Sequence, residues 1–358
     1  MRKRASFSGA CSGVRPLPDA GGEPDRREPG RPVDDLIQPF QLESGGDGEA
    51  KLSGRLGRLG DAVDDLLNRH DYPEPVAELL GEALALSATL AGALKFDGIF
   101  TLQIQGDGPV SLLLADVQTK DGAERYVVRG YAKYDDEALA KHNPEESLLG
   151  EGYLALTVDQ GKHTDRYQGM VEIVGNNLAE CAQHYFRQSQ QMDAAISVSA
   201  GRTGPDGAWR AGAIMVQRIA DDPNIQLPSD DGDDTWRRVM MLMATGTETE
   251  MLDPTLTAER YLFRLFHEEG VRVTDPRPVA RGCRCSSDRV FNVLVQLPRE
   301  DLLDLAVDGN LEVTCEFCSE TYSFTPEAVE ARAAETVADT ATGQTLNPVI
   351  ESPESPSK

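Results

Sequence analysis

The hydrophobic positions of the chain follow two different periods. Between residues 73 and 94 apolar residues recur every three or four positions, which predicts a core helix that Pro73 opens. Between residues 98 and 132 apolar and polar residues alternate, and short glycine-containing stretches interrupt the alternation. Alternating strands joined by short turns predict an antiparallel meander.

Similar patterns continue to about residue 220. They predict further strands at residues 153–158, 167–173, 196–199 and 209–218, and helices at residues 60–68 and 178–190. Residues 34–220 are therefore expected to form an α+β domain, an antiparallel sheet with packed helices. This region has no G-x-S-x-G, H-E-x-x-H or P-loop motif, and the five histidines of the chain are scattered. We expect no enzyme.

Residues 221–278 have a different character and are expected to form a metastable helical linker. The segment opens with an acidic, proline-containing stretch, and helices are predicted at residues 236–243 and 256–269. The first of these is rich in methionine, whose flexible side chain suits a promiscuous binding surface, although a helical core stripe is the commoner role. The candidate binding residues are Trp236, Met240, Met241 and Met243.

Four of the six cysteines form two tight pairs, Cys283-Arg284-Cys285 and Cys315-Glu316-Phe317-Cys318. A helix is predicted between the pairs, at residues 287–307, and short strands at residues 311–314 and 321–324 flank the second pair. Two turns that each deliver two thiolates predict a tetrahedral zinc site in residues 279–325, with one ion per chain. Cys11 and Cys181 lie far from this segment and are expected to be spectators.

Two roles are open for this zinc site. Most four-cysteine sites only hold a small domain together, but their pairs are usually spaced C-x2-4-C, whereas the first pair here is C-x-C. Two extended residues span about 7 Å between Cα atoms, near the upper limit of about 6.8 Å for a disulfide. With a bend, Cys283 and Cys285 come within this range, and Cys315 and Cys318 do so more easily across a turn. Oxidation is therefore predicted to give Cys283–Cys285 and Cys315–Cys318 bonds. The spacing permits a redox switch and does not prove one.

Charge and cysteine usage restrict the compartment and the partners. The formal net charge of -25 repels nucleic acid and anionic membrane surfaces, so neither is an expected partner. Clustered cysteines in a cysteine-poor chain favour a reducing compartment, here the cytoplasm. The basic start of the chain lacks a following apolar segment, so export is not expected, and its Arg/Ser bias leaves an organelle-transit segment as the alternative. Residues 1–33 and 326–358 are polar, low in apolar periodicity and expected to be disordered.

Several motifs resemble, in the same order, one known family. They are His70-Asp71-Tyr72-Pro73, Leu94-Lys95-Phe96-Asp97-Gly98, Leu102-Gln103-Ile104-Gln105-Gly106-Asp107-Gly108-Pro109, Tyr167-Gln168-Gly169, Phe266-His267-Glu268-Glu269-Gly270-Val271-Arg272-Val273 and the two cysteine pairs. The family is the redox-regulated bacterial chaperone known as the 33-kDa heat-shock protein, and the resemblance covers roughly residues 34–324. The chain departs from the family in its first thirty-odd residues and at Ser319, where the family often has glycine.

The resemblance implies a holdase, which binds unfolding proteins without ATP and is activated by oxidation. It also implies that oxidation to two disulfides releases zinc and unfolds the linker, and it leaves a homodimer of the oxidised form open. Two other function classes remain. A nucleic-acid-binding zinc ribbon would need a basic face, which the charge opposes. A thiol oxidoreductase using Cys315 and Cys318 would need its C-x-x-C at a helix start, and here the pair lies between predicted strands.

Overall fold

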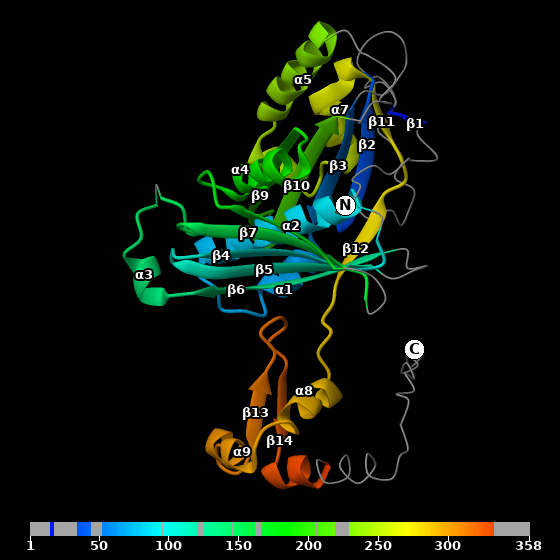
Figure 1. Ribbon diagram of the computed structural model, residues 1–358. Coiled ribbons are helices and arrows are strands. Elements are labelled where there is room, and N and C mark those ends of the chain that lie inside the picture. Colours follow the sequence, from blue (N-terminus) through cyan, green and yellow to red (C-terminus); the bar gives the residue numbers. More distant parts are fainter. Residues whose placement is uncertain are drawn as a thin grey trace. The chain divides into compact units, whose positions relative to one another are not determined.

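The computed structural model divides the chain into two compact units, Met1–Cys283 and Arg284–Lys358 (Figure 1). Each unit is described by itself. The structure describes residues 15–17, 34–43, 52–94, 96–119, 125–144, 146–161, 166–204, 207–218 and 229–332.

The first unit is built on a twelve-stranded sheet that is antiparallel almost throughout. Its main path, in spatial order, is β8 (Tyr167–Glu172), β7 (Gly152–Asp159), β4 (Gly98–Gly106), β5 (Val110–Thr119), β6 (Tyr126–Tyr134), β12 (Arg277–Arg281), β2 (Leu36–Leu42), β3 (Leu52–Leu59), β10 (Ala208–Arg218) and β9 (Ala194–Thr203). Off this path, β11 (Val271–Val273) pairs with β2 and with β1 (Arg15–Pro16). The β4–β5–β6 meander and the α+β class are confirmed.

The first unit also contains helices, most of which pack on this sheet. They are α1 (Asp61–Leu67), α2 (Glu74–Gly92), α3 (Asp136–Ala140), α4 (Leu178–Tyr185) with a π turn at Phe186–Gln190, α5 (Ser229–Ala244), α6 (Glu248–Met251) and α7 (Ala258–Phe266) with a 3-10 turn at His267–Glu269. Helix α2 is apolar on most sides, and most of its residues from Val76 onward are buried, with Glu78, Leu79 and Glu82 only partly buried. It forms the centre of the first hydrophobic core, with the meander and α1 around it.

A second core lies on the other face of the β2–β3–β10–β9 part of the sheet. Alternation along β2 separates the two cores: Ile37 belongs to the first, and Leu36 and Phe40 belong to the second. Helices α5 and α7 cover the second core, and α6 approaches β10 closely. A Cβ at Gly212 of β10 would lie 2.5 Å from Met251 Cγ, so glycine is needed there. Most of the predicted linker that the structure describes is therefore packed on the sheet.

The structure adds features that the sequence patterns did not reveal. Strands β2 and β3 were not predicted, and the segment expected to be a purely helical linker also contains β11 and the start of β12. These last strands have only three and five residues, too few to establish an alternating pattern, and they form where β2 and β6 offer partners. Residues 15–17, inside the predicted N-terminal extension, include β1. The tail beyond residue 332 lies outside the described residues.

The second unit is small. It contains α8 (Ser287–Leu294), α9 (Arg299–Leu305), the hairpin of β13 (Leu311–Thr314) and β14 (Thr321–Phe324), and helical residues 326–332. The prediction of a single helix over residues 287–307 is wrong. The helix is interrupted before Pro298, which acts as the N-cap of α9. The fully buried apolar side chains of its core are Leu294, Leu302, Leu311 and Val329.

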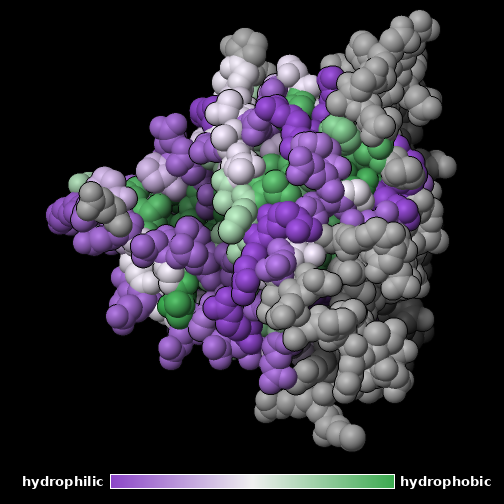
Figure 2. All heavy atoms as spheres, turned by 90° about the horizontal axis from the view of Figure 1, so that it is seen from above, coloured by the Kyte–Doolittle hydropathy of each residue, from purple (hydrophilic) through white to green (hydrophobic). Residues whose placement is uncertain are grey.

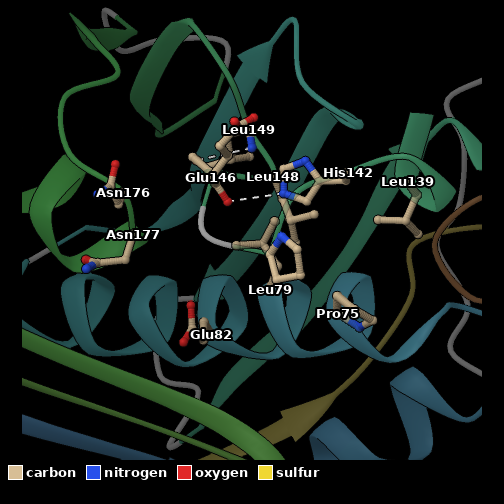
Figure 3. A pocket seen from close by; sticks show the side chains of 12 residues that line it. Pro75, Leu79, Glu82, Leu139, His142, Glu146, Leu148, Leu149, Asn176 and Asn177 are labelled. Atoms are coloured by element: carbon tan, nitrogen blue, oxygen red, sulfur yellow. Dashed lines mark hydrogen bonds between the residues drawn. The ribbon is translucent and has the colours of Figure 1, made fainter.

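The molecular surface is mostly polar on the face that Figure 2 shows, and hydrophobic side chains form separate small patches there. Among the exposed large hydrophobic residues of the first unit are Met240 and Met241 on α5, which are 38% and 68% exposed. None of the described helices is both long and apolar enough to cross a membrane. A pocket of about 360 Å³ opens beside α2, between the segment that follows α3 and the start of α4 (Figure 3).

Candidate metal centre

The first cysteine pair directly follows a strand of the main sheet. Strand β12 ends at Arg281, and the next residue continues its pairing, because the Gly282 amide donates to the Val128 carbonyl at 3.0 Å. A Cβ at Gly282 would lie 2.4 Å from Val127 Cγ1, so only glycine fits here without displacement. Cys283 and Cys285 come next. Ser286 then caps α8 by accepting a hydrogen bond from the Arg289 amide at 3.3 Å, which ends the extended segment.

The second pair lies in the turn of the β13–β14 hairpin. The Cys315 amide donates to the Glu320 carbonyl at 2.9 Å, and the Ser319 amide donates to the Cys315 carbonyl at 2.8 Å. These bonds fold the four-residue segment from Cys315 to Cys318 back on itself, so both sulfurs point to the same side. Ser319 has φ of +56°, in the left-handed region that favours glycine. This explains physically why glycine suits the position where this chain has serine.

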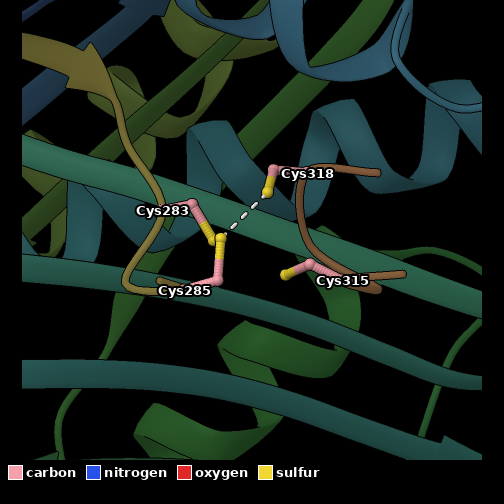
Figure 4. Close-up of side chains that lie close together, drawn as sticks. All are labelled: Cys283, Cys285, Cys315 and Cys318. Carbon is pink, nitrogen blue, oxygen red and sulfur yellow. Dashed lines mark hydrogen bonds between the residues drawn. The ribbon is translucent and has the colours of Figure 1, made fainter. Parts of the chain in front are cut away.

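The turns bring the four thiol groups together (Figure 4). The sulfur atoms of Cys283, Cys285, Cys315 and Cys318 all lie within 4.8 Å of one another, and the Cys285 and Cys318 sulfurs are 3.3 Å apart. Four thiolates about 2.3 Å from a tetrahedral zinc ion would lie about 3.8 Å apart, which is within this range. A disulfide would need about 2.05 Å between sulfur atoms, and none of the four cysteines forms one. The cluster can hold a metal ion, and its all-sulfur ligand set is consistent with zinc.

Two neighbours of the cluster were missed by the sequence patterns. The Tyr322 hydroxyl, on β14, donates a hydrogen bond to Cys285 Sγ at 3.2 Å, and this bond raises the pKa of the tyrosine above its usual value. A donor to a ligand sulfur orients the ligand and spreads its negative charge. Gly282 is the other. Its position before the C-x-C pair was visible in the sequence, but the need for glycine arises only from the packing of Val127.

The remaining candidate residues lie elsewhere. Cys181 is buried in the first core, where burial raises the pKa of its thiol, so it is a poor nucleophile. Cys11 lies outside the described residues. On α5 the methionine run is divided: Met243 is buried in the second core, and Met240 and Met241 are exposed. Trp236 is partly buried, with the Arg218 guanidinium 5.5 Å from its ring centre.

Comparison with known proteins agrees with the motifs and with the fold. The sequence model of the family described as Hsp33 protein matches residues 41–325. A 33 kDa chaperonin of Caulobacter vibrioides is 41% identical over 303 residues, which cover 82% of this chain and 96% of the relative. A 33 kDa chaperonin of Pseudomonas fluorescens is 39% identical over 295 residues, covering 82% and 91%.

A solved structure supports the fold. The crystal structure of the 33 kDa chaperonin of Thermotoga maritima superposes with a TM-score of 0.66, at 23% identity, and covers 84% of this chain and 99% of that one. The relatives are named chaperonins and not enzymes, in agreement with the lack of an enzyme motif. The match of the family model over most of the chain, together with the two relatives, shows that this chain belongs to the Hsp33 family of chaperones.

Proposed function

We propose that this protein is a redox-regulated, ATP-independent holdase whose switch is the four-cysteine cluster. One observation carries the proposal. The first ligand, Cys283, comes two residues after β12, and β12 is a strand of the sheet that also carries the helices of the linker. Unfolding of the cysteine segment can therefore affect the packing of the linker through a short, continuous piece of chain.

In the reduced form, Cys283, Cys285, Cys315 and Cys318 would together hold one zinc ion, which keeps their sulfurs as thiolates, the form that oxidants attack. Metal binding of this kind contributes about 10–16 kcal/mol to the folding of a small domain at neutral pH. The fully buried apolar core of the second unit consists of only four side chains in the described residues, so its fold depends strongly on these ligands.

Oxidation would convert each pair of thiolates into a disulfide. One peroxide molecule accepts two electrons from a cysteine pair and, with two protons, leaves as two water molecules, while the new bond joins the two sulfurs. The pairs Cys283–Cys285 and Cys315–Cys318 are favoured because only one or two residues separate their members once the metal has been released. The 3.3 Å contact between Cys285 and Cys318 does not select a partner, since all ligands of one tetrahedron are neighbours.

The linker would carry the response. It is attached to the sheet by the second core and by the buried Arg58 of β3, which donates at 2.6 Å to the carbonyl of Asp253, and also to that of Leu256, both in the α6–α7 connection. Ordinary apolar contacts of this kind stabilise a segment far less than a metal site does. When α5 and α7 undock, Met243, Val239 and Leu262 would join the exposed Met240 and Met241 as apolar surface for unfolding client proteins.

The setting of this activity follows from the same residues. Thiolates that must stay reduced until stress occurs favour the cytoplasm. The charge of -25 would keep the opened form soluble, and nucleic acid and membranes are not expected partners. Exposed apolar surface in the oxidised form also provides a contact for homodimer formation, which sedimentation of the reduced and oxidised forms would reveal.

The test combines three measurements on the full chain before and after peroxide: zinc content, suppression of client aggregation and hydrogen exchange. We expect zinc loss, a gain in suppression, and a sharp fall of protection at residues 235–243 and 256–268 while residues 98–132 stay protected. Cys181→Ser is the matched control and should respond like the natural chain. Unchanged linker protection in an active, oxidised sample would contradict the linker mechanism, and peptide mapping that finds mainly cross-pairs would contradict the proposed disulfides.

A further inference from the structure

The pocket beside α2 has an acidic side chain, Glu82, among the residues that line it from this helix. Pro75, Leu79 and Glu82 line it from one face of α2, because positions four and three apart lie above one another on a helix. Its volume of about 360 Å³ falls in the range of small-molecule sites, which begins at about 300 Å³. Figure 3 shows Pro75 and Glu82 on this helix, below Leu148 and Leu149.

The walls of the pocket are mainly apolar, and local hydrogen bonds hold them. Leu139, Pro144, Leu148 and Leu149 form one side of the lining. The His142 Nε2 lies 3.1 Å from the Glu146 carbonyl oxygen and closes the loop after α3. On the other side, Asn177 caps α4 by accepting from the Glu180 amide at 2.9 Å. The pocket is thus largely preformed.

The Glu82 carboxylate has no partner of opposite charge within the described part of the chain. Its side chain is partly buried, no described donor or cation contacts it, and the charges that act on it belong to Glu78 and Glu248. Burial first, and then these two carboxylates, raise the pKa of Glu82 to about 7. An acid in this position leaves a negative charge uncompensated whenever it is ionised.

We propose that this pocket binds an aliphatic ammonium group, which pairs with Glu82 while its carbon chain lies against the leucine and proline walls. The acidic surroundings exclude an anionic ligand. A metal ion is a poor fit, because among the described residues the cysteines are the one group with suitable ligand spacing. A free aliphatic amine and the lysine side chain of a polypeptide offer the same chemistry. The proposal does not depend on the redox switch.

Binding should become tighter as pH rises. The ammonium group stays charged up to about pH 9, whereas the ionised fraction of Glu82 rises about tenfold between pH 6 and pH 8. Among the described residues, Glu78 and Glu248 add to the negative field at Glu82, and His142 and Glu146 are the other ionisable groups that line the pocket. A Glu82→Gln variant separates the contribution of Glu82 from theirs.

The experiment is a calorimetric titration of the reduced, full-length protein with hexylammonium, 1-hexanol and hexanoate. At pH 8 we expect hexylammonium to bind about tenfold or more tightly than 1-hexanol, and hexanoate not to bind. Glu82→Gln should bind hexylammonium about tenfold more weakly at pH 8. Its affinity should also no longer rise between pH 6 and pH 8. Glu78→Gln, which removes a charge one turn away on the same helix, should stay within about threefold of the natural chain.

Two further outcomes complete the test. Competition by Nα-acetyl-lysine methylamide would assign the site to lysine side chains of polypeptides, and failure to compete would assign it to free amines. Equal affinities for hexylammonium and 1-hexanol, or an unchanged affinity in Glu82→Gln, would overturn the proposal. Absence of hexylammonium binding at pH 8 would overturn it as well.

Discussion

The two compact units are stabilised in different ways. In the first unit, one hydrophobic core surrounds α2, and a second core lies on the opposite face of part of the sheet. Most helices and strands of this unit therefore contribute side chains to a hydrophobic core. Among its described residues, the second unit has four buried apolar side chains at the centre of its core, and four large exposed ones, Val293, Leu303, Leu305 and Val307. Small domains with so little core need a metal, a disulfide or a partner to fold.

Under the proposed function, this difference would let a redox signal act on one unit and spare the other. In the proposed function, the cysteine cluster reacts with oxidants, and the zinc that it would hold supplies most of the folding free energy of the second unit. The core of the first unit contains no comparable group among its described residues, since Cys181 is buried and its thiol is poorly ionised. A chemical change at four sulfur atoms should thus unfold the small unit and leave the large sheet intact.

Loss of one cysteine of the metal site should have the largest effect on zinc content and on the folding of the second unit. In Cys315→Ser we expect the reduced protein to lose its zinc and the second unit to unfold, because about 10–16 kcal/mol of metal-dependent folding energy is removed. Metal analysis and amide NMR of the full chain measure both, and the first unit should stay folded. Cys181→Ser serves as the control with zinc retained. Near-stoichiometric zinc in Cys315→Ser would contradict the metal assignment.

The next largest effect concerns the docking of the linker on the first unit. Phe266 of α7 is fully buried, and its ring stacks on Phe40 of β2 with centroids 5.8 Å apart. Phe266→Ala should lower the free energy of unfolding by about 3–5 kcal/mol in urea denaturation of the reduced protein. Phe263 lies on the same helix but is only partly buried, so Phe263→Ala should lower the free energy of unfolding clearly less. Equal losses would mean that α7 is not docked in solution.

The titration of Glu82 should give the stability of the first unit a pH dependence. The pKa of Glu82 is raised by burial to about 7 in the folded state from the ordinary 4.5, so its stabilising effect is complete below pH 4.5 and is lost as pH rises through 7. Glu82→Gln should therefore match the natural chain near pH 4.5 and exceed its stability at pH 8 by at most about 3 kcal/mol. Thermal unfolding at the two pH values measures this. Equal stability at pH 8 would contradict the raised pKa.

The smallest predicted effect lies in the second unit. Ser319 adopts φ of +56°, which costs less for glycine, so Ser319→Gly should stabilise this unit by about 0.5–1 kcal/mol. Ser323→Gly, in the extended strand β14, should destabilise it by a similar amount. Zinc affinity under chelator competition reports both changes. A loss of affinity in Ser319→Gly would show that the serine side chain, and not the backbone, is what this turn needs.

Sequence patterns predicted some parts of this structure well for a physical reason. Period-two alternation identified the meander because β4, β5 and β6 pair with their neighbours in sequence, so each strand carries its own pattern and turn. Helix α2 was equally clear. The break before Pro298 was missed, although Pro298 was visible, because apolar positions on both sides continue the helical spacing.

The family and the four metal-binding candidates are determined by the sequence alone, because paired cysteines at short spacing carry their geometry with them. Tertiary structure alone decides what surrounds them. The parallel pairing of β12 with β6, the close fit of Gly282 on Val127 and the docking of α7 on β2 join residues distant in sequence, and no local pattern encodes them. The uncompensated charge of Glu82 is of the same kind, since a carboxylate on a helix becomes a binding candidate only when its neighbours in space are known.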